Sequence, residues 1–176
     1  MHKFSWVNFG ATAMALLFSH TSLADKSVRA DVSVGLAHVA KAGYDEGAVL
    51  DQSLAIENIA LYRVGYIYVK NIHLENSRYD DSQVEIEVKG PYAGLGKSFD
   101  LGRLKLEAGG GIMVVTTEGK YASRTYTSDR KTRPYANAKL LLPLSKLISL
   151  QADVKYLNDV SGSDLYLFTG GVRFAF

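Results

Sequence analysis

The sequence has 176 residues, no cysteine and a formal net charge of +2. This length is typical of one domain, and the lack of cysteine excludes stabilising disulfides. The 20 lysines and arginines nearly balance the 18 acidic residues, so the overall charge does not indicate a nucleic-acid-binding protein.

The N-terminal segment has the composition of a secretory signal peptide. A short basic start, Met1 to Lys3, precedes a mostly apolar run over residues 4–18, and small residues follow at Ser22 and Ala24. We predict cleavage after Ala24, which makes 1–24 a signal peptide for Sec export and 25–176 the mature domain. A single membrane-anchoring helix is the alternative, but the apolar run is shorter than the ~20 residues that such a helix needs.

Eight segments of the mature chain alternate between two kinds of residue, which indicates β-strands with two different faces. In the first, Val32 and Val34 alternate with Asp31 and Ser33. The predicted strands cover residues 28–38, 48–56, 60–72, 84–99, 104–113, 135–142, 147–157 and 165–176. The second is the least regular. In the fourth we expect a bulge at Gly90-Pro91, since proline cannot donate a ladder hydrogen bond.

The last two strands are long enough to identify the fold class. A soluble strand usually has about 5–6 residues, whereas a tilted strand that crosses a bilayer needs about 9–11. Residues 147–157 and 165–176 have the second length, and their polar faces explain a mean hydropathy of only −0.01. The sequence therefore predicts an all-β protein, an eight-stranded antiparallel up-and-down transmembrane β-barrel.

Loop lengths predict the orientation of this barrel. Short turns follow the second, fourth and sixth strands, whereas residues 117–134 form a long hydrophilic connection after the fifth. Because outer-membrane barrels have short periplasmic turns and longer external loops, we expect the long connection outside the cell.

Charged residues recur on the strand faces expected to point into the barrel. An eight-stranded barrel is only wide enough for side chains to fill it, so these charges predict an interior of ion pairs. A narrow conducting channel and catalytic carboxylates are the alternatives. The predicted interior charges are Arg29, Asp31, Asp51, Arg63, Glu85, Glu87, Lys89, Lys105, Glu107, Lys139, Asp153, Lys155 and Arg173, with Glu57 at the rim.

The connection over residues 118–133 is basic and contains tyrosines. Its cations, Lys120, Arg124, Arg130, Lys131 and Arg133, outnumber its acids. Guanidinium and ammonium groups beside aromatic rings suit the phosphates of lipopolysaccharide or an anionic host polymer. The alternative is a loop whose charge only keeps it solvated.

Signs of catalysis and of bound cofactors are weak. His38 could meet Asp81 and Ser82 at the external rim, a set that would suit acyl transfer, although such residues are common in loops. The mature chain has only two histidines, His38 and His73, and no cysteine, so we expect no transition-metal site and no cofactor.

The segment Gly90-Pro-Tyr-Ala-Gly-Leu-Gly96, the glycine-rich fifth strand and the ending Gly170–Phe176 resemble the OmpX/Ail group of small outer-membrane proteins. The resemblance implies a monomer whose terminal aromatic, Phe176, is read by the outer-membrane assembly machinery. Some members are adhesins or complement-resistance factors, although this chain has a shorter first loop. An eight-stranded palmitoyl transferase is similar in shape, but the charged interior faces argue against its apolar acyl pocket.

These observations favour a non-enzymatic barrel of a Gram-negative outer membrane with a structural or surface-interaction role. Its expected partners are membrane lipid, lipopolysaccharide, the assembly machinery and a host surface, with no nucleic acid. A lipid A-modifying enzyme, acting by acyl transfer or deacylation, is the second hypothesis, and a narrow ion channel is the third.

Overall fold

The computed structural model describes residues 28–74, 84–121, 124–128 and 130–176, so the predicted signal peptide lies outside the described residues. Every regular element in these ranges is a β-strand, and no helix there is long and apolar enough to cross a membrane. The strands are β1 (Val28–Val39), β2 (Gly47–Glu57), β3 (Leu61–Leu74), β4 (Val84–Leu101), β5 (Leu104–Tyr121), β6 (Arg124–Thr127), β7 (Lys131–Pro143), β8 (Ile148–Val160) and β9 (Ser163–Ala175).

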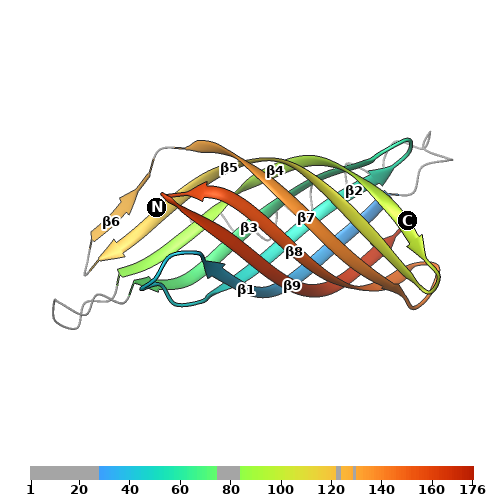
Figure 1. Ribbon diagram of the computed structural model, residues 1–176, viewed down its shortest axis with the longest axis horizontal. Helices are drawn as coiled ribbons and strands as arrows, with labels where there is room; N and C mark the ends of the chain where they lie inside the picture. The colour runs from blue at the N-terminus through green and yellow to red at the C-terminus, as the bar shows by residue number, and fades with distance from the viewer. Residues whose placement is uncertain (1–27, 75–83, 122–123, 129) are drawn as a thin grey trace, which may run out of the picture.

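The strands form one closed antiparallel barrel (Figure 1). Of the nine strands in the sheet, β6 pairs with β5 alone, and the other eight form the barrel, in which each strand pairs with the barrel strand on either side. Pairing of β1 with β9 joins the first and last strands of the chain, and pairing of β4 with β5 makes the wall continuous. The predicted eight-stranded up-and-down barrel is confirmed.

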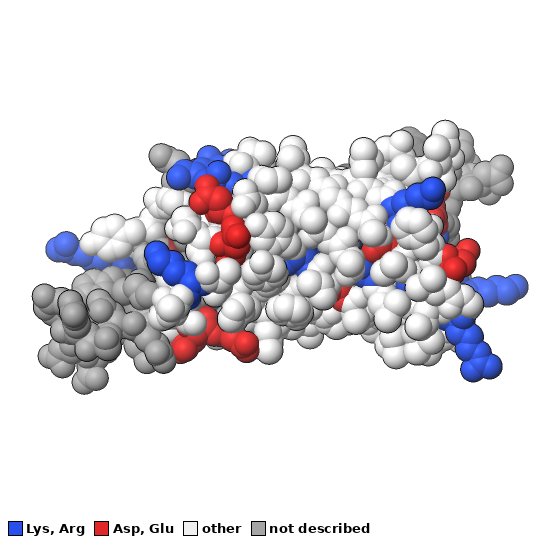
Figure 2. All heavy atoms as spheres, in the orientation of Figure 1, with Lys and Arg blue, Asp and Glu red and all other residues white. Residues whose placement is uncertain are grey.

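The outer surface of the wall is apolar across the middle of the barrel. Figure 2 shows a mostly uncharged band on the visible face, with charged side chains gathered toward the two ends. All eight barrel strands contribute exposed large apolar side chains to the wall, among them Val34, Leu50, Val64, Leu95, Ile112, Leu140, Leu150 and Phe168. An apolar exterior on every strand is the surface that a lipid bilayer requires.

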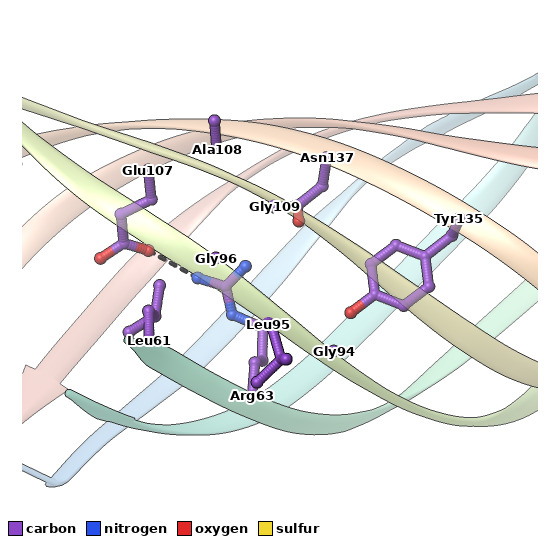
Figure 3. Close-up of a pocket in the computed structure, with 10 residues that line it drawn as sticks. All are labelled: Leu61, Arg63, Gly94, Leu95, Gly96, Glu107, Ala108, Gly109, Tyr135 and Asn137. Carbon is purple, nitrogen blue, oxygen red and sulfur yellow. Dashed lines mark hydrogen bonds and ion pairs between the residues drawn. The ribbon is translucent and has the colours of Figure 1, made fainter. Parts of the chain in front are cut away.

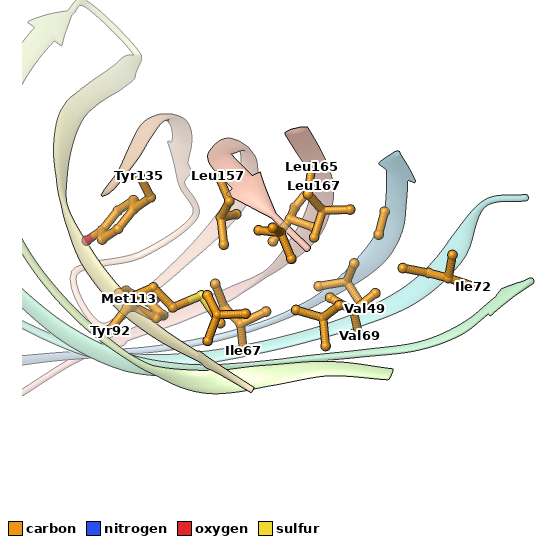
Figure 4. Close-up of a cluster of buried hydrophobic side chains, with 14 residues drawn as sticks. Val49, Ile67, Val69, Ile72, Tyr92, Met113, Tyr135, Leu157, Leu165 and Leu167 are labelled. Carbon is orange, nitrogen blue, oxygen red and sulfur yellow. The ribbon is translucent and has the colours of Figure 1, made fainter. Parts of the chain in front are cut away.

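The lumen has two layers of different chemistry. Buried charged and polar side chains fill the part nearer to the short turns and the C-terminus. A cluster of buried apolar side chains fills the part nearer to the long connections (Figure 4). The apolar cluster consists of Ala37, Val49, Ile67, Val69, Ile72, Val88, Tyr92, Met113, Val115, Tyr135, Leu157, Val160, Leu165 and Leu167.

The predicted bulge at Gly90-Pro91 is wrong. Lys89 lies opposite Thr116 and Tyr92 opposite Met113, so the register of β4 against β5 is the same on both sides of the proline. Gly90 faces the lumen, where a Cβ atom would collide with the carbonyl oxygen of Val114. The proline therefore lacks one ladder donor without adding a residue to the strand.

The irregularity lies instead in β3. The pairing of β3 with β4 shifts by one residue between Val69 and Ile72, and Asn71 adopts a φ of 61° there. An extra residue in one strand changes which side chains face inward beyond it. As a result both Val69 and Ile72 point into the apolar cluster.

The long hydrophilic loop predicted at residues 117–134 is largely a β-hairpin. β5 continues to Tyr121, β6 returns antiparallel to it, and β7 begins at Lys131. At the base of this hairpin the backbone N–H of Ser128 donates to the carbonyl oxygen of Thr117 at 2.8 Å. Alternating polar and β-branched residues such as Thr125 and Thr127 extend readily as strand, which explains why hydrophilicity alone was misleading.

Candidate functional site

We call the charged part of the lumen, nearer to the short turns, the inner layer, and the apolar part the outer layer. A network of buried ion pairs occupies the inner layer. Glu107 on β5 is its centre, because its carboxylate accepts hydrogen bonds from Arg63 at 2.5 Å, Arg29 at 3.2 Å and Arg173 at 2.8 Å. Arg173 in turn donates from Nε and Nη2 to the two carboxylate oxygens of Asp31, at 2.6 and 2.8 Å. Such paired planar contacts are the strong form of an arginine–carboxylate interaction.

The network continues through two lysines toward the apolar layer. Lys139 Nζ lies 2.6 Å from Asp31 and 3.8 Å from Asp153, and Lys155 Nζ bridges Asp153, at 3.4 Å, and Asp51. Both lysines are almost completely buried. Because each cation has at least one carboxylate partner, the desolvation of the charges is offset by attraction and hydrogen bonding.

Tyr92 joins the two layers. Its ring belongs to the apolar cluster and stands edge-on to Tyr135, with ring centroids 5.3 Å apart. Its hydroxyl donates to Asp51 at 2.8 Å, and Lys155 Nζ lies 4.7 Å from the centre of its ring. The ring makes apolar contacts on one side, while its hydroxyl and face satisfy buried charges.

Inward-facing glycines make room for the two tyrosines. A Cβ atom at Gly65 would lie 2.5 Å from the ring of Tyr92, and one at Gly94 would collide with the hydroxyl of Tyr135. Sequence reasoning did not identify these tyrosines as interior residues. Gly90 and Tyr92 are two residues apart, so they lie on the same face of β4. Once Gly90 is placed on the lumen side, the alternation of the strand places Tyr92 there as well.

A small cavity lies within the inner layer, beside the part of the barrel wall that β3, β4, β5 and β7 form (Figure 3). Its volume is about 10 Å³, close to the minimum for one water molecule. Arg63, Glu107, Asn137 and Tyr135 line it together with glycines of β4 and β5. Arg63 Nε is buried without a protein hydrogen-bond partner, as are both amide atoms of Gln151. The space suits one bound water better than a substrate.

Lys105, predicted to point into the barrel, and Glu57, predicted at its rim, both lie at the mouth of the barrel beside the short turns. Lys105 pairs with Asp100 at 3.4 Å beside the β4–β5 turn, and both side chains are largely exposed. Glu57 pairs with Arg29 and is partly exposed. These positions mark the rim at which the ionic network ends.

The interior placement of Glu85, Glu87 and Lys89 is wrong. Val88, their neighbour, belongs to the apolar cluster, so the charged residues on either side of it face outward. On that face Lys89 pairs with Glu118 at 2.7 Å, and Lys120 pairs with Glu87 at 2.5 Å. The prediction failed because it assumed polar-inward alternation along the entire strand.

The five cations predicted to form an anion-binding loop fall into two groups. Lys120 is paired with Glu87, and Arg133 lies 2.7 Å from Asp159. The other three, Arg124, Arg130 and Lys131, are exposed, and within the described part of the chain no carboxylate pairs with any of them. We call these three side chains the outer cation group.

The candidate catalytic set is only partly described. His38 is exposed at the outer end of β1, while Asp81 and Ser82 lie outside the described residues. Within the ranges that the structure covers, no three histidine, aspartate or glutamate side chains gather as metal ligands would. Phe176 is exposed beside the wall, and its backbone N–H donates to the carbonyl oxygen of Val28 at 2.8 Å.

Comparisons with known proteins establish the fold. No protein family and no curated protein matches the sequence. Among solved structures, Neisserial surface protein A has a TM-score of 0.63 at 18% identity, over 86% of this chain and 97% of that chain. Ail of Yersinia pestis, in complex with the heparin analogue sucrose octasulfate, has a TM-score of 0.53 at 13% identity, over 86% and 97%.

A structure from the de novo design of transmembrane β-barrels is similar to the same degree, with a TM-score of 0.56 at 16% identity, over 85% of this chain and 95% of that chain. A designed barrel can share this architecture without sharing a biological role, so likeness at these identities extends to the fold alone. At that level the resemblance to small barrels of the OmpX/Ail type is confirmed.

Proposed function

We propose that the chain is a non-enzymatic barrel of a Gram-negative outer membrane, and that its outer hairpin binds anionic surface polymers. The apolar wall supports the membrane location, since every barrel strand presents apolar side chains outward. Sec export, a monomeric state and assembly through recognition of Phe176 belong to the same proposal.

The observation that carries the binding proposal is the outer cation group. Arg124 lies on β6, Arg130 lies between β6 and β7, and Lys131 is the first residue of β7. No acidic side chain of the described residues pairs with any of the three. Unpaired guanidinium groups bind phosphates and sulfates through charge-assisted hydrogen bonds. Lipopolysaccharide phosphates and sulfated host polymers share this chemistry.

The neighbouring structure of Ail adds support, because that protein was solved with a sulfated ligand. The two chains share the barrel fold at 13% sequence identity. We therefore take sucrose octasulfate as the first probe for this chain.

The test measures binding of sucrose octasulfate by titration calorimetry to the barrel in phospholipid nanodiscs. We expect the triple variant Arg124→Gln, Arg130→Gln, Lys131→Gln to bind at least about tenfold more weakly, and the affinity of the unchanged barrel to fall with added salt. The matched control removes the same charge from the opposite mouth with Lys97→Gln, Arg103→Gln and Lys146→Gln. Equal affinities for the two triple variants would overturn the proposal.

Titration with lipid A phosphates in place of the octasulfate separates the two sources of anion. Stronger dependence of lipid A binding on the outer cation group would assign lipopolysaccharide as the ligand, whereas stronger dependence of octasulfate binding would assign a sulfated polymer.

The filled lumen supports the absence of a channel function. Ion pairs occupy the inner layer and packed apolar side chains occupy the outer layer. We expect little or no steady conductance from the purified barrel in planar bilayers. Steady single-channel currents would favour the channel hypothesis instead.

A further inference from the structure

Lys97 places a positive charge on the lipid-facing wall of β4. The outward side chains on either side of it along the strand, Leu95 and Phe99, are exposed and apolar. Lys97 itself is exposed, and no carboxylate in the described part of the chain pairs with it. A lysine in this setting needs a partner, because lipid tails cannot solvate an ammonium group.

The apolar stretch of wall is shorter on β4 than on the adjacent strand β5. On β4, three uncharged outward positions separate Lys97 from Lys89, which pairs with Glu118 on the outer surface. They are Pro91, Ala93 and Leu95. On β5, six uncharged outward positions follow one another, namely Leu104, Leu106, Ala108, Gly110, Ile112 and Val114. Lys97 lies opposite Ala108, so it enters a level of the wall at which the neighbouring strand is apolar.

The direction of the Lys97 side chain brings its charge to the boundary of the membrane. Lys89 and Lys97 are eight residues apart, which on a tilted strand corresponds to about 20 Å across the membrane. Lys97 Nζ lies 5.8 Å from the centre of the Phe99 ring, and Phe99 is two residues nearer to the β4–β5 turn. That displacement adds about 5 Å, so the ammonium lies about 25 Å from the level of Lys89, the usual height of the apolar band of such barrels.

The other charges at this end of the β4–β5 hairpin favour an anion beside Lys97. Arg103 in the turn is exposed, and no acidic side chain of the described residues pairs with it. Asp100 is the one acidic residue between Lys97 and Lys105, and it pairs with Lys105 at 3.4 Å. Three cations against one carboxylate leave a local positive charge, which attracts anionic lipid headgroups.

We propose that Lys97 binds the phosphate of an anionic phospholipid in the inner leaflet, with Arg103 as the second cation of the site. The inference rests on the proposed membrane location, because a lipid phosphate plane must then lie at this level of the wall. The acyl chains would contact Leu95 and Ala108, which are exposed beside Lys97. Charge-assisted hydrogen bonds to the phosphate oxygens would hold the headgroup. Figure 1 shows the β4–β5 turn at the same end as the C-terminus, opposite β6, so the site is distinct from the outer cation group.

The test compares two headgroups by native mass spectrometry. The barrel is released from detergent micelles that contain equal amounts of phosphatidylglycerol and phosphatidylcholine with the same acyl chains, and the lipids that remain bound are counted. We expect the unchanged barrel to retain one phosphatidylglycerol at least about fivefold more often than phosphatidylcholine, and Lys97→Gln to lose this preference. Lys97→Arg should keep it, because a guanidinium group also binds phosphate.

Lys146→Gln is the matched control. Lys146 is exposed in the turn between β7 and β8, so this variant removes the same charge from the same mouth of the barrel on a different hairpin. We expect its preference for phosphatidylglycerol to be unchanged. Unchanged heat-modifiable migration checks that each variant folds. An equal loss of preference in Lys97→Gln and Lys146→Gln would overturn the site, since only the net charge of the mouth would then matter.

Two further outcomes separate this site from other anion sites. Excess inorganic phosphate should displace little phosphatidylglycerol, because the acyl chains also contact the wall, and complete displacement would overturn a lipid site in favour of a free anion. If the unchanged barrel shows no headgroup preference while octasulfate binding depends on the outer cation group, this inference fails and the proposed function stands. If the preference depends on Lys97 while octasulfate does not bind, the lipid site stands and the proposed polymer binding fails.

Discussion

The inner and outer parts of the barrel have opposite arrangements of polar and apolar residues. At the level of Val34 the wall is apolar outside, while Asp31 and Arg173 form ion pairs inside. At the level of Val88 the interior is apolar, while Lys89 and Glu118 pair on the outside. The same strands pass through both levels.

The difference follows from the solvent around each level. Lipid tails favour apolar side chains outside, which leaves polar residues for the lumen. Beyond the membrane the surroundings are water, and the ordinary hydrophobic effect favours an apolar interior with a charged surface. The barrel therefore behaves as a membrane protein at one level and as a soluble β-protein at the other.

The largest expected effect is the loss of the network centre. Glu107→Ala leaves Arg29, Arg63 and Arg173 with fewer carboxylate partners, and breaking a buried pair typically costs about 3–5 kcal/mol. Urea unfolding in lipid vesicles measures the free energy of unfolding. The control Glu118→Ala, which breaks a partly exposed pair with Lys89, should cost about 0–1 kcal/mol. Equal unfolding midpoints for the two variants would show that the inner layer is wet.

Removing apolar volume from the outer layer should have a somewhat smaller effect. Leu157 is completely buried in the apolar cluster, and Leu157→Ala should cost about 2–5 kcal/mol in the same unfolding assay because it leaves a cavity. Leu140→Ala is the control on the lipid-facing wall, where lipid can fill the vacated space. A larger loss for Leu140→Ala would mean that the outer layer is loosely packed.

Adding a charge to the outer face tests the reversal directly. Val34→Arg places a cation against lipid and should cost about 2–4 kcal/mol, whereas Thr116→Arg, beside Lys89, should cost about 0–1 kcal/mol. Both changes are read as shifts in the urea midpoint. Similar penalties at the two positions would place the membrane boundary further out than the change of faces indicates.

The smallest effect is expected in the outer cation group. Lys131 is exposed, so Lys131→Ala should change the free energy of unfolding by about 0–1 kcal/mol. The same variant should still weaken octasulfate binding. A large loss of stability would instead assign Lys131 a structural contact at the outer end of β7.

Strand number, strand order and most inward faces could be predicted from the sequence. Alternation such as Asp153 and Lys155 against Val154 is a local property of each strand, and the barrel closes because neighbouring hairpins share it. The buried charges Asp31, Arg63, Glu107, Lys139, Asp153, Lys155 and Arg173, and the partly buried Arg29, lie in the lumen, where this alternation placed them.

Only the tertiary structure decided which charges meet and where the faces reverse. Glu107 and Arg173 are far apart in the chain, and their contact depends on the closure of the barrel. The outward position of Glu87 depends on the height of that part of β4 relative to the membrane. Alternation alone distinguishes two faces of a strand, but it does not say which of them meets lipid, water or the lumen.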